Sequence, residues 1–141
     1  MRAYDSRLLG TWRSDRRRTA EEIEARSDIP KTKKAALSAM FGHLTLHYTR
    51  TRCYSTFQGK TESLPYRVVA TNSDGVVVVS PSAPVETEES ICHIRFDDLE
   101  PQPGHYWVSL GPIREYFRRI KTPPNEEMQR TNPAQATKLR R

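Results

Sequence analysis

The chain has 141 residues, and its 23 Lys and Arg against 17 Asp and Glu give a formal net charge of +6. The length favours a single domain, and no stretch approaches the roughly 18 consecutive apolar residues of a membrane-spanning helix. Half of the excess charge lies in residues 121–141, so the charge is weak evidence for a nucleic-acid partner and we do not expect one.

The first part of the chain predicts a strand followed by a short helix. The strand is Leu8–Ser14, in which Gly10 allows a close approach or a bulge. The residues from Thr19 to Glu22 fit a capping box, in which the threonine side chain and the glutamate three positions later satisfy free backbone N–H groups. This signal predicts a helix that starts after Thr19 and ends near Arg26.

A second helix is predicted from about Lys31 to Phe41. Leu37, Met40 and Phe41 recur at i, i+3 and i+4, which places them on one face of that helix. Gly42 is a suitable residue for its C-terminal cap. The chain therefore reads as helix, break and helix before the strands begin.

After Gly42 the apolar period changes to two, which is the pattern of β-strands. Turn residues such as Asn72-Ser73-Asp74-Gly75 separate the apolar runs. The further predicted strands are His43–Thr49, Cys53–Phe57, Pro65–Ala70, Val76–Val79, Ile91–Phe96, His105–Leu110 and Ile113–Arg119. Eight short strands predict a mainly β fold, an eight-stranded antiparallel up-and-down β-barrel with a helix–turn–helix between strands 1 and 2.

These patterns divide the chain into two regions. Residues 1–120 are predicted to form the barrel domain. Residues 121–141 contain no aromatic residue and no apolar periodicity, which predicts a disordered basic tail. The residues from Met1 to Arg7 contain no apolar stretch of the kind found in signal peptides, which favours a cytoplasmic protein.

Alternate strand residues face the barrel interior, which is just wide enough to be filled or to hold one small ligand. The pattern leaves open which of these applies. It also leaves open which strand face points inward, since the opposite choice would place Trp107, His93 and Arg67 inside. The proposed interior residues are Leu44, Leu46, Tyr48, Cys53, Ser55, Phe57, Tyr66, Val68, Ala70, Cys92, Ile94, Phe96, Tyr106, Val108 and Leu110.

The predicted helical pair is expected to cover one mouth of the barrel with its apolar face. A basic cluster accompanies it, which would attract a carboxylate or phosphate if it formed the rim of a lid, or would be an ordinary solvated surface. The cluster consists of Arg16, Arg17, Arg18, Lys31, Lys33 and Lys34. The candidate ligand-binding residues combine the lid with the interior and are Leu37, Met40, Phe41, Leu46, Tyr48, Phe57, Tyr66 and Tyr106.

Gly10-Thr11-Trp12 in the first strand, the meander of strands and an Arg-rich closing strand carry a resemblance to a known superfamily. With these features the chain resembles the calycins, which include the lipocalins and the fatty-acid-binding proteins. The resemblance implies that Gly10 and Trp12 lie at one end of the barrel and that Arg118 or Arg119 packs across the Trp12 ring. An arginine stacks well on an indole. It also implies a small apolar ligand, although no particular ligand is carried over.

The remaining reactive residues give no catalytic or metal-binding pattern. Cys53 and Cys92 lack metal-ligand spacing and are expected to be two buried free thiols, with a disulfide as the alternative. His43 and His47 would lie about 13 Å apart on one strand, too far to chelate a single ion. No phosphate loop, nucleophile elbow or paired-carboxylate signature is present. We therefore assign no catalytic residue, metal ligand or cofactor.

Two function hypotheses follow from these observations. The first is a non-enzymatic carrier that holds a small apolar or amphipathic molecule, with an acidic group as an option, in a shallow barrel cavity. Arg67 or Arg95 could meet such an acidic group, although a surface pair with a glutamate is favoured. The alternative is a protein–protein interaction module with a filled barrel, in which Trp107 and Tyr54 would be outward-facing anchors.

Overall fold

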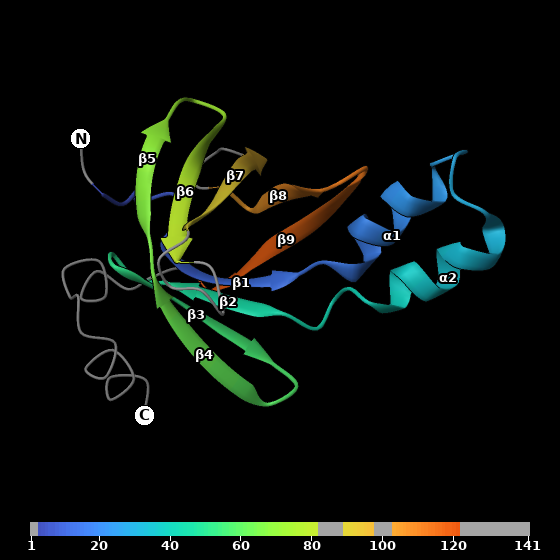
Figure 1. Cartoon of the computed structure of the whole chain (residues 1–141), viewed down its shortest axis with the longest axis horizontal. Coiled ribbons are helices and arrows are strands. Elements are labelled where there is room, and N and C mark those ends of the chain that lie inside the picture. Colours follow the sequence, from blue (N-terminus) through green and yellow to red (C-terminus); the bar gives the residue numbers. More distant parts are fainter. Residues whose placement is uncertain (1–2, 82–88, 98–102, 122–141) are drawn as a thin grey trace.

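The computed structural model describes residues 3–81, 89–97 and 103–121, to which the structural statements below refer. Within these residues the chain forms a nearly closed antiparallel β-barrel and a helical arm (Figure 1). The elements in chain order are β1 (Gly10–Ser14), α1 (Arg16–Glu24), α2 (Lys31–Ala39), β2 (Thr45–Tyr48), β3 (Arg52–Phe57), β4 (Lys60–Pro65), β5 (Arg67–Thr71), β6 (Gly75–Pro81), β7 (Glu89–Asp97), β8 (His105–Leu110) and β9 (Ile113–Lys121). The predicted tail lies outside the described residues from position 122 onward.

The strands form one sheet in the order β4-β3-β2-β1-β9-β8-β7-β6-β5. Every pair of neighbouring strands in this order is antiparallel, so the mainly β, antiparallel barrel is confirmed. The two strands at the ends of this order, β4 and β5, are separated along the chain by Tyr66 alone. One extended segment therefore passes from one sheet edge to the other, and this passage brings the barrel close to closure.

The predicted strand number of eight is wrong, because the structure has nine strands among the described residues. The strand that the sequence does not reveal is β4, whose polar residues lie at an exposed sheet edge. Gln58 and Gly59 both have positive φ values, 51° and 77°, which is the backbone of a tight two-residue hairpin. This hairpin folds the polar segment back onto β3, so backbone pairing forms β4 without an apolar alternation.

The helices lie between β1 and β2 in the chain, but their placement differs from the prediction. The cap of α1 is Asp15, whose Oδ1 accepts a hydrogen bond from the Arg18 N–H at 3.1 Å. Thr19 is therefore inside α1, and its side chain accepts a hydrogen bond from the backbone N–H of Tyr116 in β9. The helix starts before Thr19, the predicted cap, because Asp15 supplies the side-chain oxygen of the N-cap.

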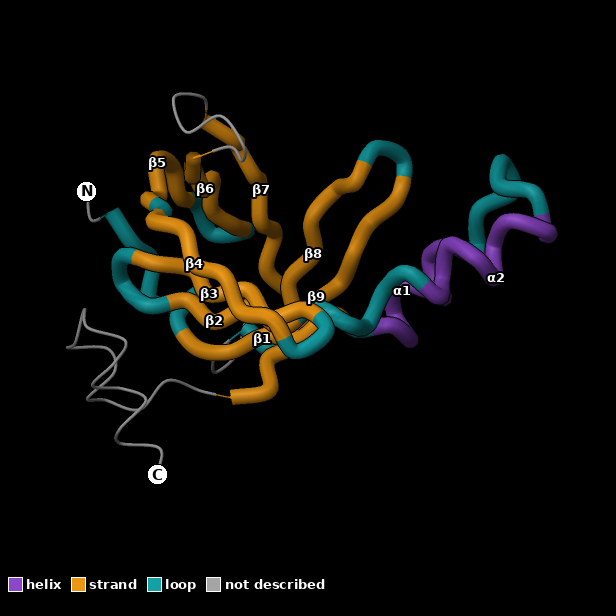
Figure 2. The backbone as a smooth tube through the Cα atoms, turned by 60° about the horizontal axis from the view of Figure 1, so that its bottom comes forward, coloured by secondary structure: helices purple, strands orange, loops and turns teal. Residues whose placement is uncertain are grey.

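The helical arm, α1 and α2 with their connection, extends away from the barrel (Figures 1 and 2). Asp15 N–H donates to the carbonyl of Tyr116, and Thr19 accepts from the N–H of the same residue. These bonds tie the start of α1 to β9 where β1 leaves that strand. The prediction that the helices form a lid is therefore wrong. The start of α1 bonds to the backbone of Tyr116 in β9, and the helices do not cross the barrel mouth.

The core lies inside the barrel and is built from the alternate residues of its strands. Val68, Val76, Val78 and Ile94 are buried there together with aromatic residues from other strands. Ala70 is exposed although the alternation predicts it inside. The register between β5 and β6 shifts between Val68 and Ala70, and such a bulge reverses the side chain's face.

Candidate functional site

One end of the barrel is closed around Trp12, Leu8 and Arg119, and we call it the closed end. The Trp12 side chain is fully buried, and its Nε1 donates a hydrogen bond to the Leu8 carbonyl at 2.8 Å. The Tyr106 ring meets the indole edge-on with ring centroids 4.7 Å apart. The indole N–H is thus satisfied locally, and the ring fills this end of the barrel.

Arg119 covers the Trp12 ring, with its guanidinium carbon 4.2 Å from the ring centroid. Its N–H groups donate to the carbonyls of Pro103, Leu9 and Arg7 at 2.9, 2.7 and 2.6 Å. Burial lowers the pKa of Arg119 to about 10. Arg118 is exposed, so the structure places Arg119 over the indole. The indole nitrogen and all three guanidinium nitrogens thus donate hydrogen bonds, as a structural closure requires.

Above Trp12 the interior is filled by aromatic side chains. The Tyr48 and Tyr106 hydroxyls lie 3.3 Å apart, and Tyr106 stacks on Phe117 at a centroid distance of 4.9 Å. The Tyr66 hydroxyl donates to the carbonyl of Thr49. Burial raises the pKa of Tyr48 and of Tyr106 well above the usual value. These tyrosines therefore form a neutral, packed floor and are not open pocket walls.

The opposite end, where β3, β6 and β8 finish, is more open, and we call it the open end. Five apolar side chains of the inner face are only partly buried where they pack against the core, and we call them the inner wall. The inner wall consists of Leu44, Leu46, Cys53, Cys92 and Val108. Further toward this end, Phe57 and Leu110 are 45% and 47% exposed. The inner face therefore offers apolar surface to solvent at this end through Phe57 and Leu110.

A slot of about 430 Å³ opens the barrel wall between β7 and β8. Among the described residues the two strands pair from Arg95 to Asp97, and toward the start of β7 and the end of β8 they separate (Figure 2). Ligand pockets have volumes of roughly 300–1,000 Å³, so the slot is large enough for a small molecule. The slot is lined by Ile91, Cys92, His93, Arg95, Trp107, Val108, Ser109 and Leu110.

Glu115 lies on the inner face beside the inner wall. It is the β9 partner of Val108, so both side chains point to the same side of the sheet. The Glu115 side chain is 9% exposed, and its Oε2 accepts a hydrogen bond from the Ser14 hydroxyl at 2.7 Å. Burial raises the pKa of this carboxyl, and the bond from Ser14 partly opposes that effect. The sequence analysis did not single out Glu115, although alternation with Phe117 could have identified it.

Both cysteines are free, as predicted from the sequence. Burial raises the pKa of Cys53 to about 12 and raises that of Cys92 as well. A thiol is a poor nucleophile because only the thiolate attacks. These side chains therefore contribute apolar surface to the inner wall.

The outer face of the barrel holds the residues whose orientation the sequence left open. Trp107 lies on this face, with the guanidinium carbons of Arg114 and Arg95 at 4.0 and 5.4 Å from its ring centroid. His93 is exposed on the same face of β7. The inward choice of Cys92 and Tyr106 is therefore correct, and Trp107 is partly covered by arginines.

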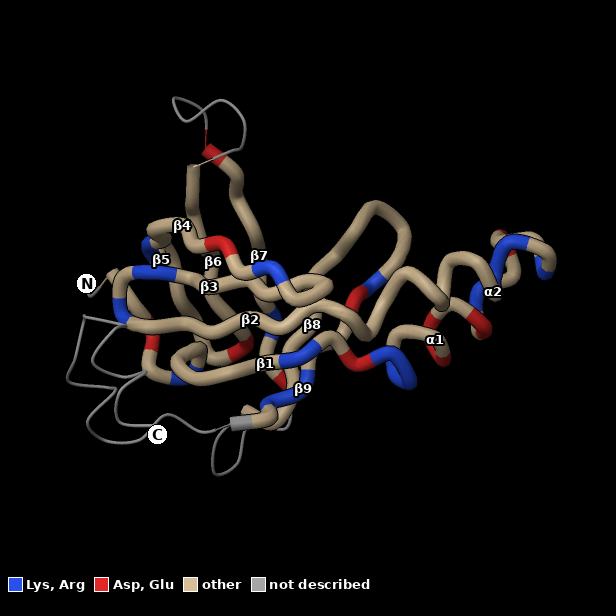
Figure 3. The backbone as a smooth tube through the Cα atoms, turned by 90° about the horizontal axis from the view of Figure 1, so that it is seen from below, with Lys and Arg blue, Asp and Glu red and all other residues tan. Residues whose placement is uncertain are grey.

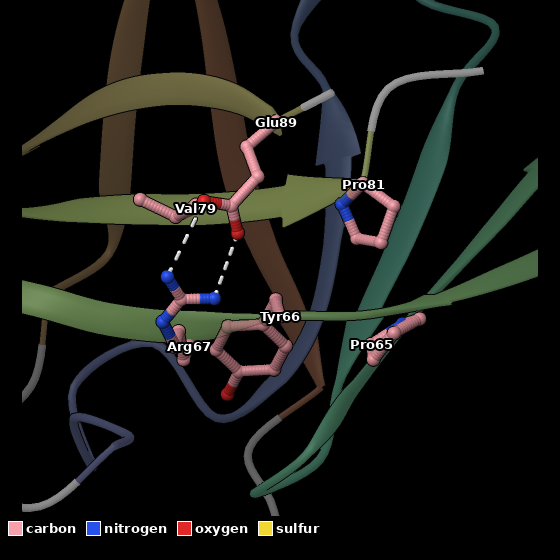
Figure 4. Close-up of a pocket in the computed structure, with 6 residues that line it drawn as sticks. All are labelled: Pro65, Tyr66, Arg67, Val79, Pro81 and Glu89. Carbon is pink, nitrogen blue, oxygen red and sulfur yellow. Dashed lines mark hydrogen bonds and ion pairs between the residues drawn. The ribbon is translucent and has the colours of Figure 1, made fainter. Parts of the chain in front are cut away.

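A second, smaller groove of about 180 Å³ lies where β4 passes into β5 (Figure 4). On it, the Arg67 guanidinium binds the Glu89 carboxylate through contacts of 2.8 and 3.4 Å. This is the surface pair with a glutamate that the sequence favoured. Because Arg67 is paired and exposed, the groove offers no free cation to an acidic ligand.

The predicted ligand-binding residues fall into three places. Leu46, Tyr48, Tyr66 and Tyr106 come together in the barrel, the tyrosines in its packed floor. Phe57 lies at the open end. The third group, Leu37, Met40 and Phe41, lies at the C-terminal end of α2, where the chain returns toward β2; α2 has no buried residue, and Met40 is 68% exposed.

The basic cluster on the helical arm is partly neutralised by acidic neighbours. Figure 3 shows Lys and Arg beside Asp and Glu along this arm. Arg18 contacts Asp97 at 2.9 Å and lies over the Tyr116 ring at 4.6 Å. Arg17 lies 3.8 Å from Glu21. The arm is therefore a surface of mixed charge, with Arg18 fastening it to the barrel.

Within the described part of the chain, no group of three or more His, Cys, Asp or Glu side chains could hold a metal ion. No helix in those residues is long and apolar enough to cross a membrane. Comparisons with protein-family models, curated proteins and solved structures found no match. The nearly closed antiparallel barrel is compatible with a calycin-like fold, and its geometry carries the functional argument.

Proposed function

We propose that this protein is a non-enzymatic carrier, calycin-like and cytoplasmic, that binds a small apolar or amphipathic molecule at the open end of its barrel. The observation that carries the proposal is the contrast along the inner face. The floor is packed, whereas the inner wall of Leu44, Leu46, Cys53, Cys92 and Val108 is only partly buried beside a slot of about 430 Å³. Apolar concave surface with a few polar groups is typical of ligand sites.

A neutral fluorescent probe, N-phenyl-1-naphthylamine, tests this proposal. We expect saturable fluorescence enhancement with the native protein and at least tenfold weaker binding for Val108→Trp, which fills the slot. Val69→Trp is the matched control, because Val69 is 42% exposed on β5 and does not line the slot. Absence of saturable binding by the native protein, with no copurified small molecule in native mass spectrometry, would refute the proposal.

A further inference from the structure

The charged groups of the inner face are unevenly distributed. Arg119 lies at the closed end and is held by three carbonyls. Register places Lys60 and Glu62 on the same face as Phe57 and Ser55, but their side chains are 81% and 73% exposed at the tip of the β3–β4 hairpin. Two acidic residues of the described chain thus lie on the inner face beside the open end. Glu62 is at the exposed hairpin tip, and Glu115 is buried beside Val108 of the inner wall.

The two arginines considered as partners of an acidic ligand lie off the inner face of the barrel. Arg67 is bound to Glu89 on the outside of the barrel. Arg95 lies on the outer face over the Trp107 ring and lines the outer side of the slot. An acidic amphiphile on the inner face beside Val108 would therefore meet the Glu115 carboxyl, whereas the cation Arg95 borders the slot from its outer side.

Glu115 retains capacity to bind another donor. A carboxylate has two acceptor oxygens, and within the described residues only the bond from Ser14 to Oε2 is formed. In the described residues, Arg50 Nε is the one fully buried side-chain polar atom that lacks a hydrogen-bond partner. Oε1 of Glu115 also lacks a partner, so it is not fully buried. Val108, the cross-strand partner of Glu115, lines the slot, so the Glu115 side chain lies on the same sheet face, one strand away from the slot.

We propose that the ligand of this site is an amphiphile with an ammonium group, held by Glu115 while its hydrocarbon part packs against Leu46, Cys92 and Val108. The inference rests on the proposed carrier function and specifies its ligand class. An ion pair in partly apolar surroundings is stronger than one in water, and an ammonium supplies the N–H donors that Oε1 lacks. A carboxylate ligand would instead repel Glu115.

Calorimetric titration with decylamine, decanol and decanoate at pH 7.4, below their aggregation limits, tests the inference. These probes share one chain length and differ in head group. We expect the native protein to bind decylamine at least tenfold more tightly than decanoate. Glu115→Gln should remove this preference and leave decanol binding unchanged, because glutamine retains the shape and an acceptor for Ser14.

Glu62→Gln is the matched control, since Glu62 lies on the same sheet face but is exposed near the barrel rim. It should leave the preference for decylamine intact. Binding of decanol without a preference for decylamine, or a preference that survives Glu115→Gln, would overturn the inference while leaving the carrier function standing. Binding of none of the three probes would instead overturn the carrier function itself.

Discussion

The two ends of the barrel use the same strands and the same alternation of side chains, but they are finished differently. At the closed end, β1 pairs with β9, and Arg119 covers Trp12 while binding three carbonyls. At the open end, β7 and β8 separate, and Cys92 and Val108 of the inner wall line the slot between them. The comparison teaches that side-chain alternation defines an interior, whereas the completeness of strand pairing determines whether that interior is filled.

The largest expected difference between the two ends is in packing energy. Leu8 is fully buried at the closed end, so Leu8→Ala should lower the free energy of unfolding by about 3 kcal/mol. Leu110 is 47% exposed at the open end, and Leu110→Ala should cost less than about 0.5 kcal/mol. Urea unfolding measures both values. Similar losses for the two variants would show that the ends are packed alike.

Arg119 gives the next largest effect. Arg119→Met keeps the length of the side chain but removes the cation over Trp12 and leaves the carbonyls of Arg7, Leu9 and Pro103 without their donor. We expect a loss of about 2 kcal/mol in the free energy of unfolding. Arg118→Met, at the neighbouring exposed position, should change it by less than about 0.5 kcal/mol. An Arg119 effect no larger than that of Arg118 would exclude the structural closure.

Glu115 provides a smaller, pH-dependent difference. Burial raises its pKa above the usual 4.5, so the folded protein binds this proton more tightly than the unfolded chain. The stability contributed by the protonated carboxyl is present at low pH and falls as pH rises through the folded-state pKa. Stability of the native protein relative to Glu115→Gln should therefore decrease between pH 4 and pH 7. An increase over that range, in chemical unfolding at several pH values, would contradict the burial of this carboxyl.

Thiol labelling should reveal the slot with the least disturbance of the fold. With a pKa of about 12, roughly one Cys53 side chain in ten thousand is a thiolate at pH 8. Cys92 lines the slot, so we expect Cys53→Ser, which retains Cys92, to be labelled by a maleimide faster than Cys92→Ser. Both should react more slowly than in urea. Faster labelling of Cys53 would place the opening elsewhere in the barrel.

The sequence predicted most strands because their apolar residues alternate with a period of two. The resemblance to the calycins implied that an arginine of the last strand would pack across Trp12, but it did not distinguish Arg118 from Arg119. Their distinction depends on the register of β9 against β1, where a bulge lies between Thr11 and Trp12. Such a register is set by pairing between distant segments and has no local signal.

Other features escaped prediction for different physical reasons. The strand β4 has a polar sequence and forms through backbone pairing after the turn at Gln58 and Gly59. The helical arm follows the edge of β9 because Thr19 and Asp15 bond to Tyr116. The slot arises where strands part, a property of the assembled sheet. Glu115 becomes a candidate ligand-binding residue only because its cross-strand partner Val108 lines this slot.

The pairing of β1 with β9 also has a consequence for the order in which the protein is made. Trp12 leaves the ribosome well before Arg119, and at 5–20 residues per second the interval is roughly 5 to 20 seconds. During synthesis the Trp12 indole is therefore not covered by Arg119, and β1 lacks its neighbouring strand β9. Nascent chains that stop before β9 should accordingly need chaperone protection that the finished protein does not.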